Sequence, residues 1–225
     1  MKSGKMKFII SLIILALVIG VIVYSLWPKQ AAEEGDSLLS FKIVSQDLSE
    51  EEKADYLNKF QAAKTSLEQN PDNFTLWLSL GTLKKYAGDY EGAEKVWIYV
   101  GEIRPKNSIS FGNLADLYTN FLKDYDKAIS AYQTAIANSV GEAGNARFYR
   151  NFFEFYLYYL NDKAAAESIL LEGIEKNPAN SELPILLAGF YRDEGNKQKA
   201  IEYFEKALAL DPQDDLVKAE LKKLK

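Results

Sequence analysis

The chain has 225 residues, of which 48% are hydrophobic and 26% are charged, so it can bury one substantial core and does not have a disordered protein's composition. It contains no cysteine and no histidine, which excludes disulfides, thiolate and imidazole catalysis and every Cys/His metal site. The formal net charge of −5 disfavours a nucleic-acid partner, because an acidic surface repels phosphate. We therefore expect one globular unit with no cofactor and no metal site.

The first predicted element is a transmembrane helix over residues 8–27, FIISLIILALVIGVIVYSLW, which carries no charge. Twenty helical residues at about 1.5 Å each span roughly the 30 Å of hydrocarbon in a bilayer. Three lysines precede this run and three acidic residues follow it by position 36, which predicts a cytoplasmic N-terminus over residues 1–7 and an extracytoplasmic remainder. The sequence thus predicts a single-pass membrane protein. A cleaved signal peptide is the alternative, although the apolar run is long for one and no clean cleavage site follows it.

Residues 28–47 are predicted to form a linker, because PKQAAEEGDS is polar and rich in helix breakers. Ser49 and Glu52 have the spacing of a capping box, which predicts a helix over residues 50–69 and a domain that covers residues 48–225. Removing the three lysines of residues 1–27, which hold no acidic residue, leaves 24 basic and 32 acidic residues. The predicted extracytoplasmic part is therefore acidic.

A pattern of large and small residues repeats along residues 74–214. The clearest copy starts at Ser181 and has landmarks at Leu187, Ala188, Tyr191, Gly195, Ala200, Phe204, Ala207 and Pro212. This pattern resembles the tetratricopeptide repeat (TPR), a helix hairpin of 34 residues. In the same register the copies cover residues 74–107, 108–145, 146–180 and 181–214, and the second has one extra residue that we place in the turn between its helices. The resemblance implies an all-α, TPR-like solenoid of about four helix hairpins. The flanking sequence predicts N- and C-terminal capping helices, and the apolar run of residues 8–27 predicts one transmembrane helix before them.

The stretch FYRNFFEFYLYYL, residues 148–160, is unusually rich in aromatic residues. The repeat register turns one set toward the partner helix of the same hairpin: Tyr149, Phe152, Phe153 and Tyr156. A second set faces the neighbouring repeat: Phe148, Phe155 and Tyr159. Only Tyr158 is predicted to point toward the groove. Phe153 occupies a position where the family has Gly or Ala, so we expect small residues of the partner helix, including Gly173, to make room for it.

The resemblance implies a protein–protein interaction scaffold that binds a peptide or protein segment in its concave groove. The predicted groove residues are Lys85, Tyr86, Asn113, Asn120, Arg147, Arg150, Asn151, Glu154, Tyr158 and Arg192. The first two arginines and Asn151 share one helix face, where they can hold a carboxylate of the partner. The alternative is a solvated face in which Arg150 pairs with Glu154. Some family members bind chaperone C-termini through a Lys, Asn and Arg set, and this chain lacks most of that set.

With an anchor, this layout is typical of bacterial envelope proteins that assist secretion or envelope assembly. No catalytic residue is predicted, because Asp124 with Asp126 falls in an interhelical turn and Asp214 with Asp215 at a helix start, where carboxylates are usual. An enzyme or glycan-binding protein of the cell envelope, secreted or anchored, is the alternative; it would use exposed tyrosines and nearby carboxylates. A homodimer, formed through the groove or the transmembrane helix, also stays open.

Overall fold

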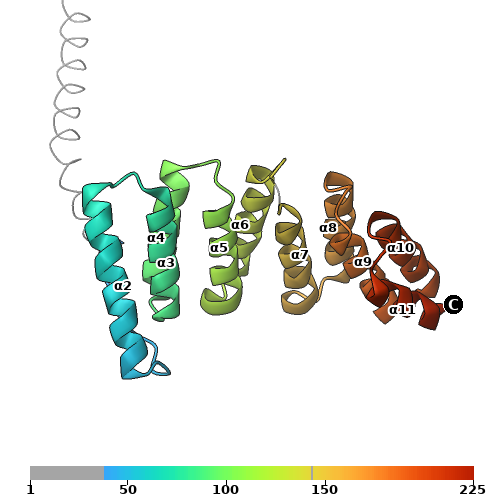
Figure 1. Cartoon of the computed structure of the whole chain (residues 1–225), viewed down its shortest axis with the longest axis horizontal. Helices are drawn as coiled ribbons and strands as arrows, with labels where there is room; N and C mark the ends of the chain where they lie inside the picture. Colours follow the sequence, from blue (N-terminus) through green and yellow to red (C-terminus); the bar gives the residue numbers. More distant parts are fainter. Residues whose placement is uncertain (1–37, 143) are drawn as a thin grey trace, which may run out of the picture.

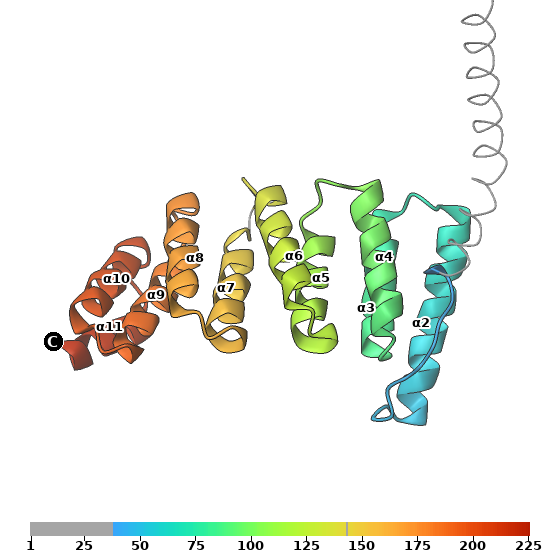
Figure 2. The ribbon, with the colours of Figure 1, turned by 180° about the vertical axis from the view of Figure 1, so that it is seen from behind.

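The computed structural model describes residues 38–142 and 144–225, and within these ranges every regular element is a helix. The α-helices are α2 (Glu50–Gln69), α3 (Phe74–Tyr86), α4 (Tyr90–Ile103), α5 (Ile109–Leu117), α6 (Tyr125–Asn138), α7 (Ala146–Glu154), α8 (Lys163–Lys176), α9 (Glu182–Asp193), α10 (Lys197–Leu210) and α11 (Asp215–Leu224). Two π-helical turns, η1 (Tyr118–Leu122) and η2 (Phe155–Tyr159), continue α5 and α7. Figures 1 and 2 show a row of antiparallel hairpins between α2 at one end and α11 at the other. The predicted all-helical solenoid is confirmed.

The membrane-spanning part of the prediction is not supported. The predicted transmembrane helix over residues 8–27 lies outside the described residues. Across residues 38–142 and 144–225, no helix has both the length and the apolar character needed to cross a bilayer. This finding corrects the predicted localisation, because no single-pass topology and no membrane contact is supported.

The second helix of each hairpin begins at a side-chain cap. Asp89, Asp124, Asp162 and Asn196 each accept a hydrogen bond from the backbone N–H three residues later, at distances of 3.0–3.2 Å. Such a cap satisfies one of the free N–H groups at a helix start and stabilises the helix by about 1 kcal/mol. The short turns between paired helices are therefore encoded locally.

The aromatic stretch is core, as predicted for most of its members. Phe148, Tyr149, Phe152, Phe153 and Phe155 are all buried. The side chain of Tyr158 is 72% exposed. Tyr159 is partly exposed, although its ring stacks on that of Phe155 with centroids 6.0 Å apart.

The space at Gly173 is taken by a different ring from the one expected. A Cβ on Gly173 would lie 2.8 Å from Cγ of Tyr149 and 3.0 Å from Leu183. Phe153 instead meets Phe190 of α9 edge to face, with ring centroids 6.1 Å apart. The large ring is therefore accommodated across the boundary to the next hairpin.

The extra residue in the second hairpin lies in the helix and not in the turn. The chain widens into the π-helical turn η1 at the end of α5, and η2 does the same at the end of α7. A π turn absorbs one additional residue without breaking the helix. Each π turn is followed closely by a residue in the left-handed region, Lys123 (φ 56°) and Asn161 (φ 51°), where the first and last hairpins have Gly88 and Gly195.

Residues 38–45, within the predicted linker, pack against the first hairpin. The ring of Phe41 stacks on that of Phe60 in α2 at 4.5 Å, and the backbone N–H groups of Val44 and Ser45 donate to the Ala87 carbonyl. Lys84, only 1% exposed, donates to the Ser40 carbonyl and lies 3.4 Å from the Asp89 carboxylate. Burial lowers the pKa of Lys84, and the nearby Asp89 charge opposes that shift.

Candidate functional site

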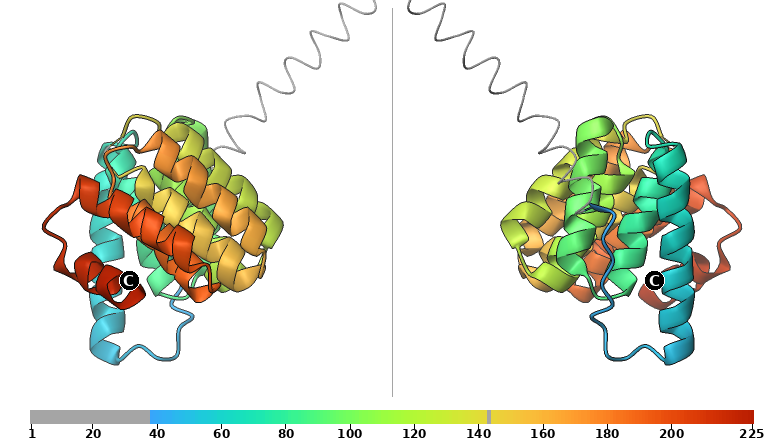
Figure 3. Two further views of the ribbon diagram at one scale, coloured as in Figure 1. Left: turned by 90° about the vertical axis from the view of Figure 1, so that its right-hand side faces the viewer. Right: turned by 90° about the vertical axis from the view of Figure 1, so that its left-hand side faces the viewer.

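The first helices of the hairpins, α3, α5, α7 and α9, form one face of the stack. The end-on views of Figure 3 place α2 and α11 on the same side of the stack, one at each end. Both terminal helices contribute to cavities with these first helices. The face therefore has two separate hollows, which we call the N-terminal groove and the C-terminal pocket.

The N-terminal groove lies between α2, α3 and α5 and has a volume of about 910 Å³. Its walls include Leu76 and Leu78 of α3 and Ile109 of α5. Its polar lining comes from hydroxyl and amide side chains, among them Tyr56, Ser66, Thr75, Ser79, Thr82, Tyr86 and Asn113. The one charged residue in its lining is Lys59, which pairs with Asp55 at 2.5 Å. The groove is therefore largely apolar with scattered neutral hydrogen-bonding groups.

Along the same face, polar contacts join successive first helices and, at the C-terminal pocket, join α9 to α11. We call this series the polar ladder. Its members are Lys85 with Asp116 (2.9 Å), Asn120 with Tyr159, Arg150 with Glu182 (2.5 Å) and Arg192 with Glu220 (2.8 Å). The ladder connects α3 to α5, η1 to η2, α7 to α9 and α9 to α11 in turn. It neutralises the charge along the middle of the face.

The ladder changes the interpretation of the arginine cluster. Arg150 was expected either to hold a partner's carboxylate or to pair with Glu154, and it pairs with Glu182 of the next hairpin. Arg192 is held by both Asp193 (2.9 Å) and Glu220. The hydrogen bonds that Arg192 donates to Asp193 and Glu220 raise the pKa of Arg192, so the guanidinium stays charged. An acidic segment that bound either arginine would therefore have to compete with an existing carboxylate partner.

The remaining predicted groove residues fall into separate places. Tyr86 and Asn113 line the N-terminal groove, and Tyr158 and Arg192 line the C-terminal pocket. Asn151 and Glu154 line a smaller polar cavity of about 200 Å³ with parts of the ladder. Arg147 is exposed, and its guanidinium lies 4.5 Å from the centroid of the Phe148 ring. The structure therefore divides the ten predicted residues among several places on the stack.

Sequence reasoning missed the contributions of the two terminal helices. Tyr56, Lys59, Ala62 and Ser66 of α2 form one wall of the N-terminal groove, although this helix was predicted only as a cap. Spacing within α2 gives no signal for this role, because a wall exists only once α2 has packed beside α3.

One member of each carboxylate pair weighed as a catalytic candidate caps a helix. Asp124 caps α6, and Asp214 caps α11 through bonds of 3.0 Å from the N–H groups of Leu216 and Val217. Within the described residues no group of three or more acidic side chains is arranged to hold a metal ion. Helix capping therefore explains Asp124 and Asp214, and Asp126 and Asp215 lie in the first turns of the same helices, where acidic residues favour the helix dipole.

Comparisons with known proteins agree with this fold. Models of the tetratricopeptide repeat match residues 110–143 and 185–214. The chain is similar to anaphase-promoting complex subunit 3 of Schizosaccharomyces pombe, with 26% identity over 157 residues. The match covers 68% of this chain and 23% of the relative, so the chain spans about a quarter of that protein's length.

Two solved structures share the fold. The structure of MamA matches with a TM-score of 0.54 and 22% identity over 72% of this chain and 91% of that chain. A tetratricopeptide repeat protein from Parabacteroides merdae matches with a TM-score of 0.54 and 20% identity, over 76% of this chain and 66% of that chain. The chain therefore contains tetratricopeptide repeats, which are generally protein–protein interaction scaffolds and typically not enzymes.

Proposed function

We propose that the chain is a non-catalytic scaffold that binds an extended or helical protein segment in the N-terminal groove. The observation that carries this proposal is the groove itself, about 910 Å³ in volume and largely apolar. Its volume lies near the upper end of the range typical of binding cavities, and scattered hydroxyl and amide groups suit the backbone of a bound segment.

The charge of the groove supports the same partner class. Lys59 is already paired with Asp55, and the remaining lining is neutral. A segment with large apolar side chains gains the burial of those side chains there, whereas a strongly acidic segment finds no free cation. Affinity would therefore depend on a few apolar anchors.

The enzyme or glycan-binding alternative has less support. It requires exposed tyrosines acting with nearby carboxylates, yet among the described residues no carboxylate lines the groove beside Tyr86. The carboxylates that line the C-terminal pocket with Tyr158 already have partners, because Asp193 and Glu220 pair with Arg192 and Asp214 caps α11. The secretion and envelope roles rested on the membrane anchor and are not part of the proposal.

The test is selection of phage-displayed random peptides on the purified chain, followed by fluorescence anisotropy with the selected peptide. Ser79→Phe fills the groove from α3, and we expect it to weaken binding by about tenfold or more. Ser168→Phe on α8 is the matched control, because both serines are exposed and donate to the carbonyl four residues earlier. The proposal fails if no peptide is enriched, or if both variants bind the selected peptide equally well.

A further inference from the structure

The C-terminal pocket lies between η2, α9 and α11 and has a volume of about 430 Å³. Its floor is formed by buried apolar side chains of successive elements, Phe153, Phe190, Phe204 and Val217. The pocket is thus a hollow on the face of the stack that reaches down to the buried core.

Two large apolar side chains stand exposed at the pocket. Leu216 of α11 is 81% exposed and Tyr158 of η2 is 72% exposed, and both line the cavity. Gly189 of α9 also lines the pocket, and a Cβ placed on this glycine would have no heavy atom within 4 Å. An incoming apolar side chain can therefore reach the helix backbone and cover both exposed residues.

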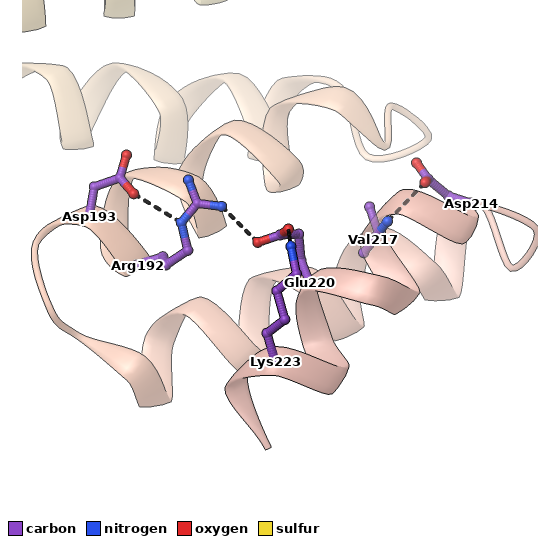
Figure 4. Close-up of polar contacts among 6 residues, drawn as sticks. All are labelled: Arg192, Asp193, Asp214, Val217, Glu220 and Lys223. Carbon is purple, nitrogen blue, oxygen red and sulfur yellow. Dashed lines mark hydrogen bonds and ion pairs between the residues drawn. The ribbon is translucent and has the colours of Figure 1, made fainter.

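The polar part of the pocket is acidic. Asp193, Asp214 and Glu220 line it with a single guanidinium, that of Arg192, so the lining carries a formal charge of −2 (one minus three). Figure 4 shows Arg192 held between Asp193 and Glu220, with Lys223 bonded to Glu220 from the far side at 2.6 Å. Asp193 is exposed and keeps its second oxygen for a further donor. The charge complement of this pocket is a cation.

We propose that the C-terminal pocket docks a protein segment with one or two large apolar side chains next to a lysine or arginine. The apolar group rests on Gly189 between Tyr158 and Leu216, and the cation pairs with Asp193. This inference rests on the proposed function, because both place a bound protein segment on the same face of the stack. It adds that the segment bound in the C-terminal pocket carries a positive charge and not a negative one.

The probe is an array of synthetic peptides in which the anchor is Leu, Phe or Ala and the adjacent residue is Lys, Gln or Glu. We expect the wild-type chain to bind the Leu and Phe peptides with Lys best, and more weakly as salt rises. Gly189→Leu fills the pocket from its floor and should weaken binding roughly thirtyfold, without lowering the melting temperature. Asp193→Asn should weaken only the Lys peptides, by about two- to fivefold at low salt.

Ser79→Phe in the N-terminal groove separates the two proposals. The inference holds if this variant binds the array as the wild type does while Gly189→Leu does not. It is overturned, with the proposed function intact, if Ser79→Phe loses the array peptides and Gly189→Leu keeps them. A preference for Glu over Lys peptides also overturns it. So does a dimer, seen by sedimentation velocity, that Gly189→Leu converts to monomer, because the occupant would then be a second copy of the chain.

Discussion

Substitution of Gly81 by alanine tests how closely the first hairpin is packed. Gly81 of α3 faces α4, and a Cβ at this position would lie 2.3 Å from Nε1 and 2.7 Å from Cδ1 of Trp97. Real Cβ atoms do not approach other atoms so closely, so either the indole or the helix must move. Trp97 is only 1% exposed, so the ring has no solvent-filled space to move into.

The size of the effect follows from three contributions. Overpacking of this kind costs about 1–3 kcal/mol. Displacing the ring also breaks the 3.3 Å bond from Nε1 to the Leu78 carbonyl, for about 1 kcal/mol more. The higher helix propensity of alanine offsets about 1 kcal/mol. We therefore expect Gly81→Ala to lower the free energy of unfolding by about 1–3 kcal/mol and the melting temperature by roughly 2–12 °C.

The matched control is Gly189→Ala, in which the same change in α9 meets no atom within 4 Å. Only the propensity gain remains there, so the melting temperature should rise by about 2–4 °C. Both variants can be followed by the helical circular dichroism signal during thermal and urea unfolding. If Gly81→Ala melts at or above Gly189→Ala, the close approach of α3 and α4 does not limit stability and the reasoning is refuted.

Three further predictions concern buried and paired polar groups. Lys84→Met leaves the buried Asp89 without its ion pair, so the free energy of unfolding measured in urea should fall by about 2–4 kcal/mol. Proteolysis between residues 38 and 48 should also accelerate, and an unchanged rate of proteolysis would contradict this prediction. Burial raises the pKa of Tyr132 to about 12 from 10.0, so the folded chain keeps a proton that the unfolded chain loses, and stability should fall as the pH rises from 10 to 12. Tyr132→Phe should reduce this fall in the free energy of unfolding, measured by urea titration, by about 2–3 kcal/mol. If the free energy of unfolding changes with pH in the same way in both proteins, the prediction is wrong. A double-mutant cycle of Arg150→Gln and Glu182→Gln should give a coupling free energy of about 0.2–1 kcal/mol, because both side chains are more than one-third exposed. This coupling should decrease as salt is added, and a coupling that does not change with salt would show that it does not arise from the ion pair.

The repeat pattern was sufficient to predict the hairpins because the pairing of small and large residues is set within each repeat. Gly81 opposite Trp97 is such a pair, and both belong to the hairpin α3–α4. The position of the extra residue was not predictable in the same way. The spacing reveals that a residue is added, but whether the helix or the turn accepts it depends on which residue takes the left-handed position, here Lys123.

The site was harder to predict than the fold, because its contacts cross repeat boundaries. Local spacing offered Glu154 as the partner of Arg150, four residues along the same helix. Stacking instead brings Glu182 of α9 within 2.5 Å, and no rule of spacing within one helix includes this pair. The same limitation hid the role of α2, whose residues become a wall of the N-terminal groove only after packing beside α3.

The polar ladder has a consequence for recognition along the whole face. Every cation in it already has a carboxylate partner from a neighbouring helix of the face, so a ligand charge at the centre must compete with an existing pair. Exchange of one exposed ion pair for another gains little free energy. The apolar surface at the two ends, in the N-terminal groove and at Gly189 in the C-terminal pocket, has no such competitor. Under the proposed function we therefore expect selectivity between partners to come from apolar anchors and from the acidic residues of the C-terminal pocket, and not from a central cationic clamp.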